Sequence, residues 1–349
     1  MVSIFVISFL LMVNALSGQN VESAFLEESN VTGEVDLGQV GEHVYWVSTK
    51  KGRGSYQINN SMQIFERENS INIKPAFFPK IAIKLDTQYA PGISTKKALV
   101  IEILEWLESK GYSKNQIMLF DRDREGLRNA GFWEDNSDGN EFLGHEVLDS
   151  SQEGYYQNDW FHDSPLPPTP FDRARFILKN AQQAEKRKTE ERRSFLPAVF
   201  LSGAYWINLA VPMDDPFLGL DGASANLTLG SISNYGRFLN KKTLSAATVA
   251  EVLAIPEIWE KRLFTILDLT TFQVANGQRF DAKYSHGRNA ILLSRNPVAV
   301  DYAAWKFINK ERVETHKLTP RRIEESLLFR YSKELGLGSG NTSQIKVIE

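Results

Sequence analysis

The chain has 349 residues, of which 42% are hydrophobic and 24% are charged, so it is long enough to bury one large core or two smaller ones. Its formal net charge of -3 lacks the basic excess that nucleic-acid binding normally requires, and we predict no nucleic-acid partner. The absence of cysteine excludes disulfides, thiolate zinc sites, a cysteine nucleophile and an iron–sulfur cluster held by the chain's own thiolates.

The first 17 residues are predicted to be a signal peptide. An apolar run from Ile4 to Val13 is followed by Ala15 and Ser17, the spacing of small residues that signal peptidase recognises. No Lys or Arg precedes this run, so an uncleaved anchor or a misplaced start codon is the alternative. The run is shorter than the roughly 20 residues that span a bilayer. We expect an exported protein, periplasmic or secreted, without membrane contact beyond this segment.

Residues 18–73 are predicted to be a strand-rich N-terminal extension, because the short runs HVYWVST and SMQIFER are separated by Gly and Asn. A single α/β domain is expected from 74 to 349. It opens with the apolar run KIAIKL, a helical pattern in TKKALVIEILEWLESKGY with Ser94 or Thr95 as its N-cap, and a second strand in NQIMLFD. Such a strand–helix–strand unit pairs its strands in parallel.

The middle of the chain is expected to be less regular. The stretch at about 134–170 is rich in Asp, Gly, Ser and aromatic residues, which predicts an irregular insertion and not a second domain. The following run, FDRARFILKNAQQAEKRKTEERR, is strongly charged and has a helical pattern. We interpret it as a solvent-exposed helix, with a binding patch as the alternative.

The last third returns to alternating strands and helices. FTILDL at 264–269 and NAILLS at 289–294 are nearly continuous apolar runs, as buried strands are. A helix should begin after Asn296, and a last one at Thr319 should stop at Gly336. The predicted fold class is α/β, with a mainly parallel sheet covered by helices on both faces and the strand-rich N-terminal extension.

Several of these pieces, in this order, resemble the domain-of-unknown-function family 362 (DUF 362). The resemblance covers about residues 74–349 and rests on IAIKLD with STKKALVIEILEWLESKGYSKNQIMLFD, on RSFLPAVFLSGAYWINLAV, on GASANLTLGSISNYGRF and on RNPVAVDYAAW. It implies a ligand-binding loop after the strand YWINL, at the carboxyl edge of the sheet, where open α/β sheets place ligands.

The sequence departs from that family's pattern in the loop. Typical members carry a lysine and a nearby histidine after the middle strand and a lysine before the loop's asparagine, and here Met213, Asp215 and Ala225 stand at those positions. Asn226 and Gly230 are kept. Because Lys and His bind oxyanions and move protons near neutrality, an anion site of the family type should be weakened or lost. The iron–sulfur ligands of many relatives are also absent.

The candidate site residues lie at strand ends and in this loop. Lys84 follows the first strand, and His286 is the histidine best placed for acid–base work, so these two are the candidate catalytic residues. The candidate ligand-binding residues are Asn226, Gly222, Gly230, Asp86 and Asp268. We expect residues from Lys84 through Asn226 to Asp268 to border a common cleft. The alternatives are structural salt bridges, solvent exposure and a structural histidine.

A divalent cation is the one cofactor with candidate ligands. The carboxylates of Asp214, Asp215 and Asp221 could hold such an ion, although Asp and Gly in this stretch also make turns. The glycines of the stretch do not form a phosphate-binding motif, so no nucleotide cofactor is predicted.

Two functions follow from these patterns. We favour a non-catalytic binding or scaffold protein that kept the fold after losing charged site residues. Its ligand would be a small molecule or a glycan, and the aromatics Tyr155, Tyr156, Trp160 and Phe161 could form a contact surface for a carbohydrate or, as the alternative, for a protein. The alternative is an exported enzyme acting on a small anionic metabolite in a crevice at the strand carboxyl ends.

Overall fold

The computed structural model describes residues 43–49, 55–133, 140–163, 193–239, 242–338 and 345–348. The predicted signal peptide and the predicted helix in the charged run at 171–192 lie outside these residues. The described residues all belong to one compact unit. No helix within the described ranges is long and apolar enough to cross a membrane.

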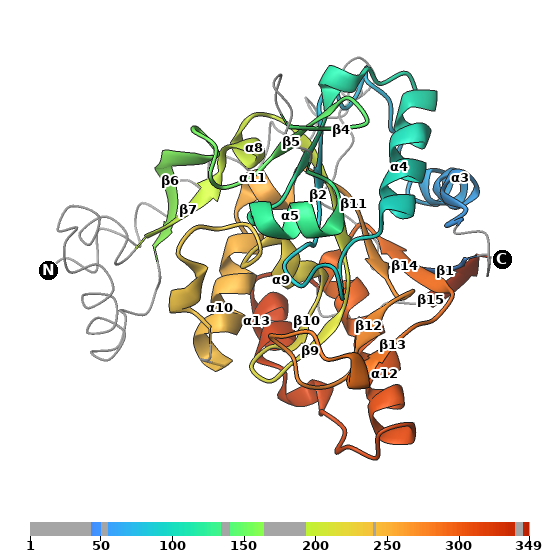
Figure 1. Cartoon of the computed structure of the whole chain (residues 1–349), viewed down its shortest axis with the longest axis vertical. Helices are drawn as coiled ribbons and strands as arrows, with labels where there is room; N and C mark the ends of the chain where they lie inside the picture. The colour runs from blue at the N-terminus through green and yellow to red at the C-terminus, as the bar shows by residue number, and fades with distance from the viewer. Residues whose placement is uncertain are drawn as a thin grey trace, which may run out of the picture. The chain divides into compact units, whose positions relative to one another are not determined.

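The centre of the fold is a nine-stranded sheet in the order β15-β1-β14-β11-β8-β2-β3-β5-β4 (Figure 1). The neighbours β11, β8, β2, β3 and β5 are all parallel, and the antiparallel pairs of this sheet are β1 with β14, β14 with β11, and β4 with β5. The strands are β1 (Val44–Ser48), β2 (Ile81–Lys84), β3 (Ile117–Phe120), β4 (Glu141–Phe142), β5 (His145–Leu148), β8 (Tyr205–Ala210), β11 (Arg262–Asp268), β14 (Ala290–Ser294) and β15 (Ile345–Ile348).

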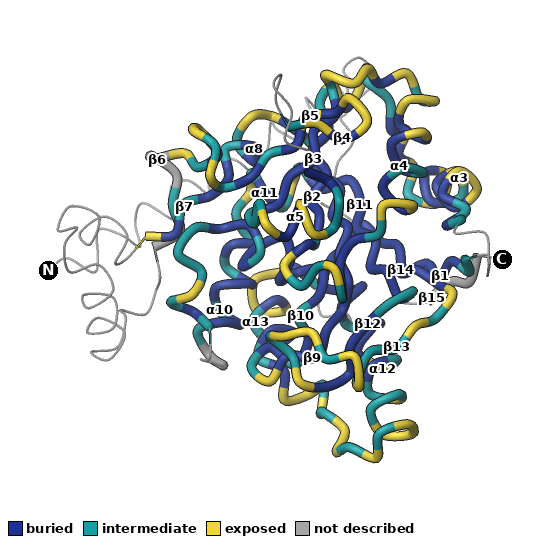
Figure 2. The backbone as a smooth tube through the Cα atoms, viewed as in Figure 1, coloured by how far each residue is buried: buried dark blue, intermediate teal, exposed yellow. Residues whose placement is uncertain are grey.

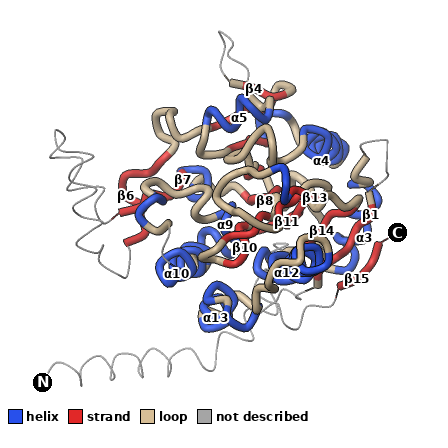
Figure 3. The backbone as a smooth tube through the Cα atoms, turned by 60° about the horizontal axis from the view of Figure 1, so that its bottom comes forward, coloured by secondary structure: helices blue, strands red, loops and turns tan. Residues whose placement is uncertain are grey.

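Helices cover both faces of this sheet (Figures 1 and 3). On one face, Phe264 of β11 packs edge-on against Phe65 and Trp106, which belong to α3 and α4. On the other face, α9, α10, α12 and α13 contribute to one large apolar cluster. Their bounds are α3 (Ile58–Glu68), α4 (Lys97–Ser109), α9 (Ala223–Leu227), α10 (Lys242–Leu253), α12 (Pro297–Glu314) and α13 (Leu327–Glu334). The predicted α/β class is therefore confirmed.

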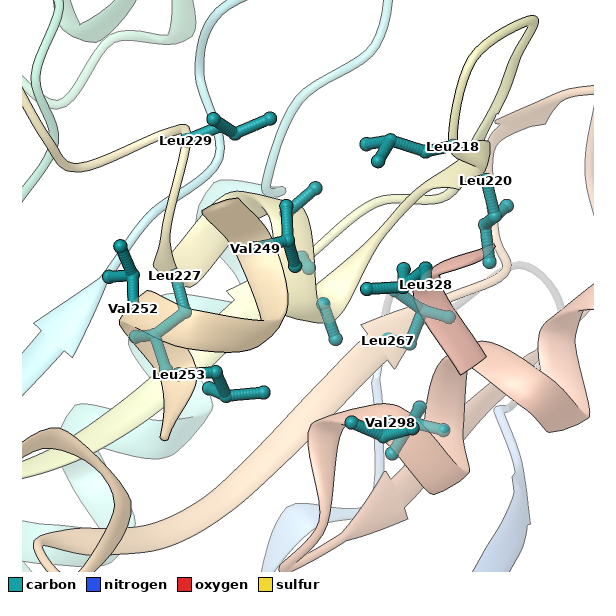
Figure 4. Packing of buried hydrophobic residues seen from close by; sticks show 14 of the residues in the cluster. Leu218, Leu220, Leu227, Leu229, Val249, Val252, Leu253, Leu267, Val298 and Leu328 are labelled. Atoms are coloured by element: carbon teal, nitrogen blue, oxygen red, sulfur yellow. The ribbon is translucent and has the colours of Figure 1, made fainter. Parts of the chain in front are cut away.

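The large apolar cluster includes residues of the segment 223–229, which contributes to the candidate site described below. Leu227 and Leu229 belong to the same apolar cluster as Val249 and Leu253 of α10 and Leu267 of β11 (Figure 4). The central strands are buried along their length (Figure 2). Continuous apolar runs such as FTIL and AILL are what a strand needs when helices cover both faces.

Two small sheets, three short α-helices and four 3-10 turns complete the described fold. β10-β9-β12-β13 form a four-stranded sheet, and β6 pairs with β7. Their bounds are β6 (Tyr156–Asp163), β7 (Arg193–Pro197), β9 (Met213–Asp215), β10 (Gly219–Asp221), β12 (Phe272–Gln273) and β13 (Ser285–His286). The short helices are α5 (Arg124–Ala130), α8 (Ala198–Leu201) and α11 (Pro256–Trp259). The 3-10 turns are η1 (Lys114–Gln116), η2 (Tyr235–Arg237), η3 (Ala282–Tyr284) and η4 (Ile323–Glu325).

The N-terminal extension differs from its prediction. HVYWVST does form β1, but this strand lies inside the main sheet between β14 and β15. The predicted strand SMQIFER is wrong, because these residues belong to helix α3. Its buried residues Ile58, Met62 and Phe65 recur at helical spacing, which places them on one side of a helix.

Three further boundaries differ. The first predicted helix has Lys96 as its N-cap in place of Ser94 or Thr95. The last helix begins at Leu327, after a 3-10 turn, and not at Thr319. The stretch at 134–170 is not irregular throughout, since it contains β4, β5 and β6. Asn296 is confirmed as a helix cap, because its side chain accepts hydrogen bonds from the amides of Val298 and Ala299.

The strand order fixes where a crevice can form. From β2 the chain proceeds to β3 and β5 on one side, and it later returns to β8 and β11 on the other side. The direction of winding therefore reverses between β2 and β8, whose last paired residues are Lys84 and Asn208. Ligands in open α/β sheets bind outside the carboxyl ends of the strands at such a reversal.

Candidate functional site

A buried polar network occupies the point where the strand order reverses. Lys84 at the end of β2 is completely buried. Its Nζ donates to Asp121 Oδ1 at 2.7 Å, to Asn226 Oδ1 at 2.9 Å and to the carbonyl of Leu85 at 2.6 Å. An ammonium group has three N–H donors. All three are used inside the protein, so Lys84 orients its neighbours and has no N–H left for a ligand.

The same network joins the loop of Asn226 to the sheet. Asn226 Nδ2 donates to Asn208 Oδ1 at 2.9 Å, and Asn208 Nδ2 donates to the carbonyl of Ala223 at 2.8 Å. Lys84 and Asn226 are 142 residues apart in the chain, so the fold brings two of the candidate residues into direct contact. Asp121 is held from the other side by the amide and hydroxyl of Thr87 at 2.8 and 2.6 Å.

Asp301 of α12 anchors the short helix α9 that carries Asn226. Its carboxylate accepts the amides of Ala223 at 2.6 Å and Ser224 at 2.8 Å. Gly222 is required for this approach, because a Cβ there would lie 2.4 Å from Asp301 Oδ1. A Cβ on Gly230 would lie 2.4 Å from the carbonyl oxygen of Asn226. These two candidate glycines therefore have a clear packing role.

A cavity of about 260 Å³ lies beside the network. Asn226 and Gly230 border it, together with Tyr89 and Tyr235. Its charged lining is strongly acidic: among the described residues it consists of one arginine, Arg122, and five aspartates, namely Asp86, Asp121, Asp123, Asp215 and Asp221. We call this the acidic cavity.

Three of the five carboxylates accept hydrogen bonds from other groups of the protein. Asp121 belongs to the lysine network, and Asp123 accepts the amide of Glu125 as the cap of α5. Asp215 accepts the amides of Phe217 and Leu218, both at 2.7 Å, and a bond from Gln278 at 3.1 Å. These three carboxylates therefore shape the wall of the cavity.

The other two carboxylates have acceptor capacity left. Asp86 Oδ2 accepts the amide of Val211 at 3.0 Å. The carboxylate of Asp221 accepts no hydrogen bond from the described part of the chain. Burial raises the pKa of Asp86 to about 6, with Lys84 opposing the shift. Burial raises the pKa of Asp221 well above its usual value, and the charges of Asp86 and Asp215 add to that shift.

The single arginine of the lining is already engaged. The guanidinium of Arg122 lies 3.4 Å from the ring centroid of Tyr235 and donates to the carbonyl of Leu229. The charge of Arg122 opposes the rise in the pKa of Asp221 but does not cancel it. The cavity therefore contains more carboxylates than the protein's own cations neutralise.

Asp86 should make stability fall as pH rises. Its pKa is 3.8 in the reference state and about 6 in the folded protein, so between these values the unfolded chain loses its proton first. The free energy of unfolding of wild type, relative to Asp86→Asn, should therefore fall from about pH 4 to about pH 6 and then level off. Urea unfolding of both proteins across this range measures the difference. A difference that stays constant, or that grows with pH, would contradict this assignment.

Asp268 does not share the cleft with Lys84 and Asn226. It accepts hydrogen bonds from Tyr56 Oη at 3.0 Å and from the amide of Thr270 at 2.8 Å. Asp268 lies two and four residues beyond Ile266 and Phe264 in β11, and alternation places it on the face that α3 and α4 cover. The network of Lys84 lies on the opposite face.

His286 is also remote from the network. It belongs to β13 of the small sheet, and its Nε2 lies 2.6 Å from Nε2 of His316. Burial and the neighbouring His316 lower its pKa. Neither the acidic cavity nor the Lys84 network includes it. The two candidate catalytic residues are therefore not brought together.

The three candidate metal ligands do not converge. Asp214 is ion-paired with Arg312 and Arg321, whereas its neighbour Asp215 borders the acidic cavity, because successive residues of a strand point to opposite faces. Of the three candidate ligands, Asp215 and Asp221 border the acidic cavity and Asp214 does not. Within the described ranges, no three His, Cys, Asp or Glu side chains are arranged to hold a metal ion. Asp214, Asp215 and Asp221 therefore do not form the predicted metal site.

The predicted aromatic contact surface is not present as proposed. Tyr155 is buried in the large apolar cluster, and Tyr156 packs against the same cluster while its hydroxyl donates to the carbonyl of Ser231 at 3.3 Å. Phe161 stacks edge-on with Phe195. The side chain of Trp160 lies outside the described atoms.

Sequence reasoning missed two central residues. Asp121 directly follows β3 as Asp86 closely follows β2, so the strand-end argument used for Asp86 would have found it. Asp301 has no comparable signal, since its partners Ala223 and Ser224 are more than seventy positions away and only the fold brings them together.

Comparison with known proteins adds little to these observations. No family model matches the chain, and no curated protein matches it. A crystal structure of a Thermotoga maritima protein, a target of the Northeast Structural Genomics Consortium, is similar over 84% of this chain and 60% of that chain, with a TM-score of 0.38 and 8% identity. This chain thus spans less than two thirds of that protein.

Proposed function

We propose that this protein binds a small organic cation, carrying an ammonium or guanidinium group, in the acidic cavity. The main support for this proposal is the carboxylate of Asp221. It borders the cavity together with Asp86 and accepts no hydrogen bond from the described residues. Asp221 is half-buried, and the ionised form of a carboxylate in such a place is stabilised by a hydrogen-bonding partner or a counter-charge. A cation placed between Asp86 and Asp221 would supply both.

The electrostatics favour a cation over an anion. Burial is the main cause that raises the pKa values of Asp86 and Asp221, and neighbouring carboxylates add to both shifts: Asp121 for Asp86, and Asp86 with Asp215 for Asp221. An adjacent cation stabilises the ionised forms and lowers both pKa values, whereas an anion would add repulsion. Tyr89 and Tyr235 also border the cavity, and aromatic rings attract ammonium groups.

The proposal keeps a binding role and changes the expected ligand. An enzyme acting on an anionic metabolite would need a free cation at the cavity to bind that anion. All three N–H donors of Lys84 already bond to groups of the protein, and His286 does not line the cavity. These observations favour a binding protein over that enzyme.

Three probes of similar length but different charge test the proposal. Putrescine is a diammonium compound, butanediol is its neutral counterpart, and succinate is a dianion. We expect calorimetric titration at neutral pH to detect saturable binding of putrescine, with butanediol and succinate each at least about tenfold weaker, because charge-assisted hydrogen bonds are stronger than neutral ones. Binding of succinate equal to or tighter than that of putrescine would contradict the proposal.

Variants locate the binding within the cavity. Asp221→Asn and Asp86→Asn should each weaken putrescine by at least about tenfold, since each removes one charged acceptor. Glu314→Gln makes the same charge change on an exposed side chain near the end of α12 and should leave the affinity unchanged. If all three variants bind like wild type, putrescine binds elsewhere and the site is wrong.

A further inference from the structure

A second cavity, of about 250 Å³, lies against the β9–β10 hairpin and has the opposite charge. Leu218 at the tip of the hairpin borders both cavities. Asp215 faces the acidic cavity, while Asp214 contacts two arginines that line the second one. The alternation of side chains along β9 thus separates an acidic cavity from a basic one.

The two arginines share one carboxylate. Arg321 donates to Asp214 through Nε and through Nη2, the latter at 2.9 Å, and Arg312 Nη1 donates to it at 3.3 Å. Asp214 is 2% exposed, so water contributes little to this group. One negative and two positive charges leave a local excess of one positive charge.

Donors for another anion are left over in this cluster. Arg312 also donates from Nε to the carbonyl of Thr319 and from Nη1 to that of Val274, both at 2.8 Å. Arg312 Nη2 and Arg321 Nη1 make no hydrogen bond to the described residues. Burial lowers the pKa of Arg312, whereas the hydrogen bond to Asp214 raises the pKa of Arg321. The two remaining guanidinium nitrogens are therefore the donors that another anion could use.

The remaining lining is suited to an apolar group. Trp305 and Phe217 border the cavity beside Pro320. The indole Nε1 of Trp305 donates to the backbone carbonyl of Arg321 at 3.3 Å, which ties the ring to this segment of the cavity wall. At the rim, Arg322 pairs with Glu325 at 3.7 Å, so these two exposed side chains add no net charge.

We propose that this second cavity binds a small monocarboxylate with an aromatic or other apolar group. Its carboxylate would accept from Arg312 and Arg321, whose planar guanidinium groups match carboxylate geometry. Its apolar part would pack against Trp305 and Phe217. The proposal is independent of the acidic cavity, because the two sites share only the hairpin and differ in charge.

Benzoate is the probe, and benzyl alcohol is its neutral counterpart. We expect saturable benzoate binding in a titration of the full chain, with benzyl alcohol at least about tenfold weaker because it offers no charge-assisted bonds. Arg312→Gln should weaken benzoate by about tenfold or more. Asp214→Asn should strengthen it, because the arginines lose their internal counter-charge. Arg330→Gln, an exposed residue paired with Glu334, is the matched control and should not change the affinity.

Each variant is first checked for cooperative unfolding. If Arg312→Gln fails to fold, Arg312→Lys keeps the charge and loses the planar fork, and it should bind more weakly than wild type. Absence of saturable benzoate binding to wild type would overturn the proposal. So would equal affinity for benzyl alcohol, or unchanged benzoate affinity in a folded Arg312 variant.

Discussion

Replacing Lys84 with Met should lower the free energy of unfolding by about 3–5 kcal/mol, the range observed when one partner of a buried ion pair is removed. Lys84 is completely buried and its ammonium lies 2.7 Å from Asp121. Methionine fills a similar volume, so the loss would come from leaving Asp121 without its cation and Asn226 without a donor. Urea or guanidinium unfolding monitored by circular dichroism measures the change.

Lys110→Met is the matched control for this prediction. Lys110 pairs with Glu66 at 2.6 Å, but its side chain is 28% exposed. A partly exposed pair contributes at most about 1 kcal/mol, so this variant should be close to wild type. A Lys84→Met protein that is no less stable than Lys110→Met would contradict the network described here. In the double variant Lys84→Met/Asp121→Asn, removal of the unpaired charge should restore part of the stability.

Replacing Asp301 with Ala should cost about 3 kcal/mol and also weaken ligand binding, because two buried amides lose a charged acceptor. These are the amides of Ala223 and Ser224, at the start of the helix that carries Asn226. Hydrogen exchange should show faster exchange of both amides, and the putrescine affinity should fall. Asp301→Asn keeps one acceptor oxygen and should lose less stability.

Hydrogen exchange at Ala223 and Ser224 can also contradict this role of Asp301. If the amides of Ala223 and Ser224 exchange as slowly in Asp301→Ala as in wild type, α9 does not depend on this carboxylate. The pKa of Asp301 is raised to about 6, mainly by burial, although both amides oppose the shift. Its protonated form offers a weaker acceptor, so the two amides should also be less protected in wild type well below this pH than above it.

Local patterns predicted the parts of the fold that local interactions determine. Short apolar runs predicted β2 and β3 as strands, the nearly continuous apolar runs of β11 and β14 predicted buried strands, and Asn296 next to Pro297 predicted the start of α12. SMQIFER failed because a short amphipathic segment fits either alternation or helical spacing until its neighbours are known. Met62 and Phe65 are both buried, and the contact of Phe65 with Phe264 of β11 places this side of the helix toward the sheet.

The candidate site was predictable only in part. Lys84 and Asp86 were found because strand ends of a parallel sheet meet at one edge, and Asn226 because the resemblance to DUF 362 implies a ligand-binding loop there. The same argument failed for Asp268, since it gives the edge of the sheet but not the face. Pairing of Asp214 with Arg312 and Arg321 could not be predicted, because those partners lie 98 and 107 residues away.

The three departures from the DUF 362 pattern have structural explanations. Met213 is buried beside Val211 and Ile93, and Ala225 belongs to the large apolar cluster. Asp215 closes the turn of the hairpin through the amides of Phe217 and Leu218. Positions where the family pattern expects Lys or His thus hold packing and turn residues, which fits an acidic cavity. Membership of this family and export of the protein stay predictions from the sequence.

A crystal structure of the protein soaked with putrescine tests the central claim most directly. We predict density for the diamine in the acidic cavity, with one ammonium group within hydrogen-bond distance of Asp221 and Asp86. Lys84 should keep its three internal partners. A saturating soak that leaves this cavity without the diamine, or that places it against other side chains, would contradict the account.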